Sequence, residues 1–345
     1  MRLPRLLART AWQTTRFGVR TSTRAGGFAG KHIGKTAGRA AVARLFDLPD
    51  VEQVPNGRMV KLRGRGKAFV VDVPGPTPDA PTVVLLHGLG AGAQLCWVGV
   101  LHELTRTHRV IALDQRWHGR GIHSPRFRIT DCADDVAALL KTLGVRQAVV
   151  AGYSMGGPVA QEMWRRHPER VSGLVLASTS CNWRGHLGEK MFFPVMGLAM
   201  DGLAAAVQAR VAQHALRLPE SPDEFQGDLV GWGAREFRST SMLSMPEVLG
   251  ELGRFNSTEW IGDIDVPTAV VITTKDKAVP AARQRAMAAA IRDVQIFEAP
   301  GGHASVFADH ANWSPVFLDA VRETTARTGR AARTGRTARS VRLVV

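Results

Sequence analysis

The chain has 345 residues, of which 45% are hydrophobic, and these values fit a soluble globular protein with one large domain or two small ones. The best candidate for a membrane span, residues 192–207, carries Asp201 in its middle, so we expect no transmembrane helix. Cys96, Cys132 and Cys181 are odd in number and widely scattered, which argues against a disulfide framework and a zinc site. We therefore expect no metal and a cytoplasmic setting, with peripheral contact at a membrane left open.

The formal net charge of +15 comes from the two ends of the chain. Residues 1–46 and 324–345 together hold 16 of the 45 Lys and Arg residues and none of the 30 acidic residues, so the part between them is close to neutral. Such ends predict partly disordered tails with weak electrostatic contact to an anionic membrane or a nucleic acid. The N-terminal segment also resembles an organellar transit peptide or an amphipathic membrane arm. No nucleic-acid module is recognisable between the tails, which argues against specific nucleic-acid recognition.

The order of the predicted elements indicates an α/β fold with a mostly parallel central sheet, helices on both faces and a helical cap. The first part of the core, residues 47–181, is expected to contain strands at 59–63, 67–73, 82–86, 109–113, 148–153 and 171–177 and helices at 93–104, 130–143 and 160–167. Thr130 or Asp131 is the expected cap of the second helix. Residues 182–263 have helical patterns without a convincing buried strand and form the predicted cap. The core resumes over residues 264–323, with strands at 267–273 and 295–297 and helices at 281–291 and 304–324.

A G-x-S-x-G motif lies near the middle of the chain, in the segment AVVAGYSMGGPVAQ at residues 148–161. A serine on such a strand-to-helix turn is held in a strained backbone, and its hydroxyl projects from the sheet edge. Gly152 and Gly156 avoid a collision across the turn, and the N–H of Met155 lies at the helix start, where it can stabilise an oxyanion. Ser154 is therefore a candidate nucleophile. On this motif alone, a glycine-rich turn without a catalytic role stays open.

A serine nucleophile needs a base and an acid that orients the base. Asp276 follows the apolar strand at 267–273, and His303 follows the last strand in Gly301-Gly302-His303. The carboxyl ends of parallel strands lie at one edge of the sheet, so both side chains are expected at the edge that carries the serine. We therefore predict a triad of Ser154, Asp276 and His303.

Other acids and histidines fit these roles less well. Asp114 also follows a strand, but its place in the topology favours a structural role. The strand at 171–177 is followed by Ser178-Thr179-Ser180, which offers no carboxylate. The remaining candidate bases lack a paired acid and an adjacent strand end, and are interpreted as surface or loop histidines: His118, His123, His167 and His310.

Three motifs together resemble the α/β-hydrolase superfamily over about residues 58–321: His87-Gly88-Leu89-Gly90, Gly152-Tyr153-Ser154-Met155-Gly156-Gly157 and Gly301-Gly302-His303. The chain order of the predicted triad is also that of the family. The resemblance implies that Leu89 supplies a second oxyanion N–H and that His87 orients its loop. One departure is Trp117, which stands where family members commonly have glycine.

The resemblance implies a serine hydrolase that cleaves a carboxylic ester, thioester or lactone through an acyl-enzyme intermediate without a cofactor. A serine nucleophile excludes the aspartate chemistry of the family's epoxide hydrolases and dehalogenases. Large, adaptable side chains in the cap favour a small apolar substrate, and the predicted pocket is lined by Tyr153, Phe192, Phe193, Met196 and Met200. Amide hydrolysis, carbon–carbon bond cleavage, perhydrolysis and a non-catalytic ligand-binding role on the same fold are the alternatives.

Overall fold

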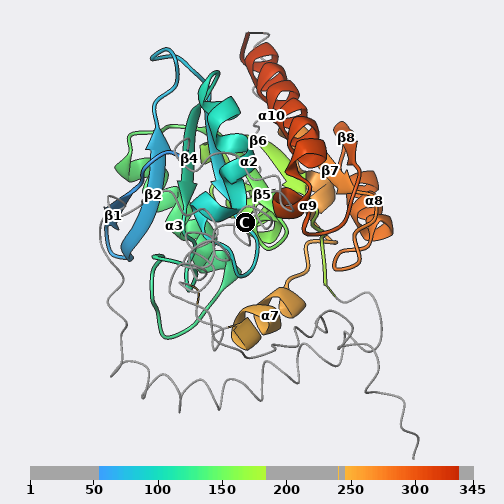
Figure 1. The fold of residues 1–345 in the computed structure, drawn as a ribbon, viewed down its shortest axis with the longest axis horizontal. Coiled ribbons are helices and arrows are strands. Elements are labelled where there is room, and N and C mark those ends of the chain that lie inside the picture. The colour runs from blue at the N-terminus through green and yellow to red at the C-terminus, as the bar shows by residue number, and fades with distance from the viewer. Residues whose placement is uncertain (1–53, 184–239, 241–244, 334–345) are drawn as a thin grey trace, which may run out of the picture. The chain divides into compact units, whose positions relative to one another are not determined.

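The computed structural model describes residues 54–183, 240 and 245–333, and an eight-stranded sheet forms their centre (Figure 1). The strands are β1 (Arg58–Leu62), β2 (Gly66–Val73), β3 (Thr82–Leu86), β4 (Arg109–Leu113), β5 (Ala148–Tyr153), β6 (Val171–Ala177), β7 (Thr268–Thr273) and β8 (Val294–Ala299). Their order in the sheet is β1-β2-β4-β3-β5-β6-β7-β8. The hairpin β1–β2 and the pair β2–β4 are antiparallel, and every other pair is parallel. The predicted mostly parallel sheet is confirmed.

Both faces of the sheet are covered by helices, because the central strands are apolar on both sides. On one face lie α2 (Ala93–Thr105), α9 (Ser305–Ala308) and α10 (His310–Arg333), and on the other lie α3 (Ile129–Thr142), α4 (Gly156–Arg166) and α8 (Ala281–Ala290). In β3, Val83 and Leu85 pack on the first face, and Val84 and Leu86 pack on the second. A 3-10 helix, η2 (Pro168–Arg170), joins α4 to β6. Within the described ranges, no helix combines the length and apolarity that a membrane span requires.

The C-terminal end of the predicted cap is packed into the core. It forms α7 (Met245–Arg254) and the 3-10 helix η5 (Ile261–Asp263), and Val248 and Leu252 belong to the cluster that includes α3 and α4. The carboxylate of Glu247 also accepts a hydrogen bond of 2.8 Å from the N–H of Phe127 in the loop before α3. This end of the insertion is therefore fixed to the core by both apolar and polar contacts. The rest of the predicted cap, 184–239 and 241–244, lies outside the described residues.

The predicted boundary at residue 323 is wrong, because α10 continues to Arg333. Thr324 is fully buried and α10 passes close to β6, since a Cβ placed on Gly173 would lie 2.8 Å from the Thr324 methyl group. Farther along, the Arg327 guanidinium donates to the carbonyl oxygens of Thr268 and Asp293, at 3.2 and 2.7 Å. The small residues of this segment can continue the helix because they pack on the sheet. This tertiary contact cannot be predicted from composition. Residues 334–345 lie outside the described part.

Candidate active site

The turn between β5 and α4 holds Ser154 in a left-handed conformation, with φ of +52°. Its N–H donates to the carbonyl oxygen of Ala177 at 2.9 Å, which ties the turn to β6. A Cβ on Gly152 would lie only 2.1 Å from the carbonyl oxygen of Gly156. Only glycine therefore fits at position 152, as the motif predicts. The strained backbone of Ser154 is kept in place by the contacts around it.

Thr179 fixes the same turn from the neighbouring strand end. Its hydroxyl is buried and donates to the carbonyl oxygen of Ser154 at 2.9 Å. The N–H of Gly157 donates to that oxygen as well, also at 2.9 Å. Sequence reasoning considered Thr179 only as a position without a carboxylate, and its contact with the turn becomes visible when β5 and β6 are paired.

Ser154 lies in line with His303 and Asp276. The Ser154 Oγ is 2.9 Å from His303 Nε2, and His303 Nδ1 is 2.7 Å from Asp276 Oδ2. An ionised carboxylate can only accept hydrogen bonds, so His303 Nδ1 must be the donor in this pair. The geometry therefore fits an imidazole with its proton on Nδ1 and its Nε2 lone pair toward the serine hydroxyl. The Asp276 side chain is fully buried and that of His303 is 26% exposed. The structure thus brings the three predicted residues together at the carboxyl edge of the sheet.

The Asp276 carboxylate is held by three donors that sequence reasoning did not identify. The main-chain N–H groups of Ala278 and Val279 donate to Oδ1, at 2.9 and 2.8 Å. The buried Gln284 of α8 donates from Nε2 to Oδ2 at 3.2 Å, and its Oε1 accepts from the N–H of Thr273 at 3.0 Å. Gln284 lies in the segment AARQRAM, where one glutamine in an alanine-rich helix gives no local signal of this contact.

The two predicted oxyanion donors belong to the residue after the serine and to a loop beside it. Met155 is the N-terminal cap residue of α4 and has helical dihedral angles, so its N–H is one of the first-turn donors that have no acceptor within the helix. Leu89 follows Gly88, and a Cβ on Gly88 would lie 3.3 Å from the Ser154 Cβ. The loop that carries Leu89 therefore passes directly beside Ser154.

His87 fixes this loop, as the resemblance implies. Its Nδ1 donates to the carbonyl oxygen of Gly88 at 2.9 Å, and its Nε2 accepts from the N–H of Gln115 at 2.9 Å. Burial lowers the pKa of His87 to about 4, because the charged form loses its hydration. The ring is therefore neutral near pH 7, which its acceptor role at Nε2 requires.

The unexpected Trp117 lies in the loop after β4. Trp117 has φ of +62°, the left-handed conformation that glycine adopts without strain, and its indole N–H donates to the carbonyl oxygen of Ser124 at 2.9 Å. Trp117 thus adopts glycine-like backbone geometry and is held by burial and this hydrogen bond. Asp114 accepts from the N–H groups of Ala93 and Arg120 at 2.7 and 2.8 Å, which agrees with its predicted structural role.

One histidine interpretation needs correction, and another holds only in part: His118 lies in a loop, as interpreted, but not at the surface. His118 is fully buried, its Nδ1 donates to the carbonyl oxygen of Arg116 at 2.8 Å, and its ring centroid is 5.2 Å from that of His87. Burial lowers its pKa to about 3. His167 does have a paired acid, because its Nε2 is 2.8 Å from the Asp134 carboxylate. The His118–His87 and His167–Asp134 contacts join segments that are separated in the chain, so the local sequence gave no sign of them.

Tyr153 differs from its predicted position on the substrate pocket. The side chain is only 3% exposed, and its hydroxyl donates to the main-chain oxygen of His303. Its ring is stacked on the imidazole with centroids 5.4 Å apart. The other predicted pocket residues, Phe192, Phe193, Met196 and Met200, lie outside the described residues.

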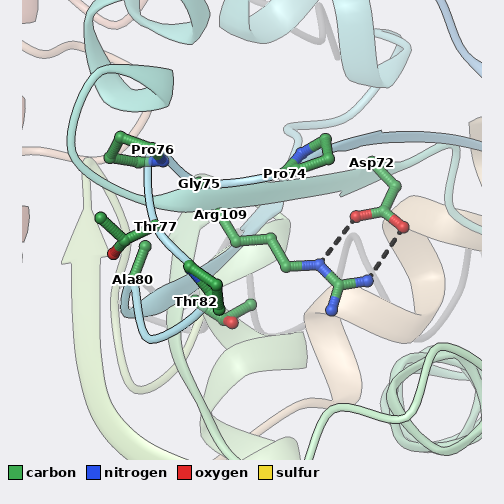
Figure 2. A pocket seen from close by; sticks show the side chains of 9 residues that line it. Asp72, Pro74, Gly75, Pro76, Thr77, Ala80, Thr82 and Arg109 are labelled. Atoms are coloured by element: carbon green, nitrogen blue, oxygen red, sulfur yellow. Dashed lines mark hydrogen bonds and ion pairs between the residues drawn. The ribbon is translucent and has the colours of Figure 1, made fainter.

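A hollow of about 460 Å³ lies at the opposite edge of the sheet, beside the amino ends of β3 and β4 (Figure 2). It is lined by Asp72, residues 74–78, Ala80, Thr82 and Arg109. Within it, the Arg109 guanidinium donates two hydrogen bonds of 3.0 Å to the Asp72 carboxylate, so the two charges satisfy each other. None of the three triad residues lines this hollow, and we assign it no part in the chemistry at Ser154.

A sequence profile described as "alpha/beta hydrolase fold" matches residues 81–310, about two thirds of the chain. The chain belongs to this α/β-hydrolase family. A protein from Variovorax paradoxus, assigned as the carbamate hydrolase RutD, is 28% identical over 271 residues, which cover 74% of the chain and 96% of that relative. The pimeloyl-[acyl-carrier protein] methyl ester esterase of Chromobacterium violaceum is 28% identical over 242 residues, which cover 67% of the chain and 90% of the esterase.

Solved structures agree on the fold. The enol-lactonase of Burkholderia xenovorans superposes with a TM-score of 0.58 at 22% identity, covering 78% of this chain and 99% of the lactonase. At this identity the likeness carries the fold alone. The family itself is shown by the sequence profile, and the sequence relatives described above are hydrolases.

Proposed function

We propose that the protein is a serine hydrolase that cleaves a carboxylic ester, or a thioester or lactone, through an acyl-enzyme intermediate. The observation that carries the proposal is the continuous line from Ser154 Oγ to His303 Nε2 at 2.9 Å and from His303 Nδ1 to Asp276 at 2.7 Å. A serine hydroxyl is a weak nucleophile until a base accepts its proton, and this geometry supplies the base and its orienting acid.

In the first half of the reaction, Ser154 Oγ attacks the substrate carbonyl carbon and its proton moves to His303 Nε2. The carbonyl oxygen becomes an oxyanion, which the N–H groups of Leu89 and Met155 stabilise by hydrogen bonds. Asp276 stabilises the imidazolium that forms. His303 then donates its proton to the leaving alkoxide or thiolate, and the acyl group stays on Ser154.

In the second half, water replaces the leaving group. His303 accepts a proton from the water as its oxygen attacks the acyl carbon, and the oxyanion forms again between the same two N–H groups. The imidazolium then returns the proton to Ser154 Oγ as the carboxylic acid leaves. With the substrate and one water molecule as reactants, proton transfers through His303 balance both halves of the reaction.

The relatives support hydrolysis at a carbonyl group, and their names differ in substrate. One is a methyl ester esterase and another a carbamate hydrolase, and a structural neighbour is an enol-lactonase. Each of these names describes attack on a carbonyl carbon that bears a heteroatom leaving group. Esters and thioesters have the better leaving groups, so we place a small apolar ester first. Carbon–carbon cleavage or perhydrolysis by the same triad, and a non-catalytic ligand-binding role, are the alternatives that the test must separate.

The purified full-length chain can be tested with p-nitrophenyl esters of graded acyl length and with a fluorophosphonate probe. We expect ester hydrolysis and covalent labelling of Ser154, and Ser154→Ala should lower kcat by about four to six orders of magnitude without changing the melting temperature. The variant Ser305→Ala is the matched control, because it removes another buried hydroxyl near the site. Labelling of Ser154→Ala, or no hydrolysis by wild type, would contradict the proposal.

A further inference from the structure

We propose that Tyr153, the residue directly before the nucleophile, is a positioning residue that holds the His303 imidazole in line with Ser154. The proposal rests on the serine-hydrolase function proposed above, because it concerns how that triad is kept in register. Tyr153 is the only tyrosine in the chain, so it can be changed and observed selectively.

Two contacts of different kinds join Tyr153 to His303. The phenol hydroxyl donates to the main-chain carbonyl oxygen of His303, which fixes the backbone of that residue. The phenol ring is stacked on the imidazole, with centroids 5.4 Å apart and an interplanar angle of 29°. One side chain therefore restrains both the position of the His303 backbone and the plane of its ring.

The loop that carries His303 needs such a restraint. It joins β8 to α9, and Gly301 within it has φ of +104°, a conformation open mainly to glycine. Main-chain donors hold the two residues before the histidine: Lys275 N–H donates to Gly301 O at 2.8 Å, and Ser305 N–H donates to Gly302 O at 3.0 Å. The third successive carbonyl, that of His303, is held by the Tyr153 hydroxyl.

The Tyr153 ring is itself fixed on its other sides. Trp97, Phe307 and Trp313 make edge-on contacts with it at centroid distances of 6.4, 6.5 and 5.8 Å. A Cβ on Gly88 would lie 2.9 Å from the ring, so the oxyanion loop also packs against it. Because Tyr153 is bonded to Ser154, a single residue links the nucleophile, the base and the oxyanion loop.

Burial also keeps the hydroxyl in its donor form. It raises the pKa of the Tyr153 phenol well above its ordinary value, because the phenolate would lose its hydration in the apolar cluster. The hydroxyl therefore stays protonated across the working pH range and keeps its hydrogen bond to His303.

The variant Tyr153→Phe keeps the ring and removes only the hydroxyl. We expect kcat to fall by about tenfold with KM within about twofold of wild type, because a displaced base affects the chemical step more than substrate binding. The rate of Ser154 labelling by a fluorophosphonate should fall by the same factor. The variant Thr324→Val is the matched control, since it removes another buried hydroxyl, bonded to Ala320 O on α10, and should leave kcat unchanged. A Tyr153→Phe enzyme with kcat within twofold of wild type would overturn the proposal.

A second measurement needs no variant. Incorporation of 3-fluorotyrosine labels the chain at Tyr153 alone and gives one ¹⁹F resonance. Because the ring is stacked on His303, this resonance should shift when Ser154 is phosphonylated. A resonance that does not respond would show that the stack does not form in solution and would overturn the proposal.

The two hypotheses fail in different ways. If wild type is neither labelled by the fluorophosphonate nor active on any ester, the proposed function is wrong. If wild type is labelled and active but Tyr153→Phe matches it in kcat and labelling rate, only the positioning role is wrong.

Discussion

The Asp276 carboxylate accepts four hydrogen bonds, two at each oxygen. Main-chain donors occupy Oδ1, so the amide of an Asp276→Asn variant would have to place its oxygen there and present its N–H₂ to His303. That arrangement favours the imidazole tautomer with its proton on Nε2, which cannot accept from Ser154. We therefore expect kcat to fall by about three to four orders of magnitude.

Asp114→Asn is the control for this prediction. Asp114 also follows a strand and is buried, but it accepts from Ala93 and Arg120 and lies outside the triad. We expect it to lower the melting temperature and to keep most of kcat. A greater loss of kcat in Asp114→Asn than in Asp276→Asn would show that the acid is assigned wrongly.

Gln284 offers a test of the support behind Asp276. In Gln284→Leu, Oδ2 loses a donor and the N–H of Thr273 loses its acceptor, so the carboxylate is held less firmly. We expect kcat to fall by about tenfold at unchanged KM. Gln161→Leu is the matched control, because Gln161 is an equally buried amide that contacts Ser180 and Ser257 instead. Equal kcat values for the two variants would show that Gln284 acts only on stability.

Two buried imidazoles predict a pH dependence of stability. A histidine in the unfolded chain titrates near pH 6.5, whereas burial lowers the pKa of His87 to about 4 and that of His118 to about 3. Between about pH 6.5 and 4 the unfolded chain binds protons that the folded chain excludes, so these groups make stability rise with pH and fall on acidification. Their contribution is complete above about pH 6.5.

The variant His118→Gln tests this dependence by urea unfolding at pH 7 and pH 5. Wild type should lose more free energy of unfolding on acidification than His118→Gln, by about 1 to 2 kcal/mol, because the amide does not titrate. His123→Gln, at an exposed position, should behave as wild type. A steeper loss in His118→Gln would contradict the assignment of His118 as a buried neutral group.

The positions of the three triad residues were predictable because each lies in a short motif just after a strand. The carboxyl ends of parallel strands lie at the same edge of the sheet, so these residues were expected to meet there. Their catalytic roles stay predictions until Ser154 is tested. Gln284 and Thr179 were not predictable, because their contacts join segments that only the folded sheet brings together. Tyr153 was placed in the motif correctly, but its contact with His303 depends on where the loop after β8 returns.

At the scale of elements, α3 is supported by another helix. The sequence predicted a cap from Thr130 or Asp131, but its N-cap residue is Arg128, without a side-chain cap. Carboxylates of α7 lie there instead: Glu247 accepts from Phe127 N–H at 2.8 Å, and Glu251 accepts from Ile129 N–H at 3.4 Å. Side-chain oxygens thus accept hydrogen bonds at the start of α3, as the capping rule expects. The acceptor for Phe127 belongs to Glu247, which lies 120 residues away in the chain.

This contact predicts different outcomes for two substitutions. Glu247→Leu leaves the buried N–H of Phe127 without an acceptor and should lower the free energy of unfolding by about 1–3 kcal/mol. Glu247→Gln keeps an acceptor oxygen and should cost less. Glu259→Gln, at an exposed position, is the control and should change little. If Glu247→Leu and Glu259→Gln give the same melting temperature, the α7 contact does not stabilise the fold.

The whole molecule combines a family core with ends of a different composition. The mostly parallel sheet was predictable, because apolar runs that alternate with helices indicate parallel strands, whereas their order in the sheet comes from the structure. The end of α10 was not, because Thr324 and Arg327 are held by β6, β7 and Asp293 rather than by an apolar stripe of their own. A chain cut after residue 323 should therefore be less stable than one cut after Arg333, whereas equal melting temperatures would show that the last turns of α10 add nothing.

The basic ends predict an electrostatic contact that is separate from catalysis. Residues 1–46 and 334–345 hold 13 of the 45 basic residues and no acid, and each charge near an anionic membrane contributes on the order of 1 kcal/mol. We expect the full chain to sediment with anionic vesicles at low salt and to be released at high salt, because exposed charges are screened. A full-length variant with these 13 residues changed to glutamine should lose the binding and keep kcat on a soluble ester. Equal binding by the two proteins, insensitive to salt, would show that these ends are not the contact.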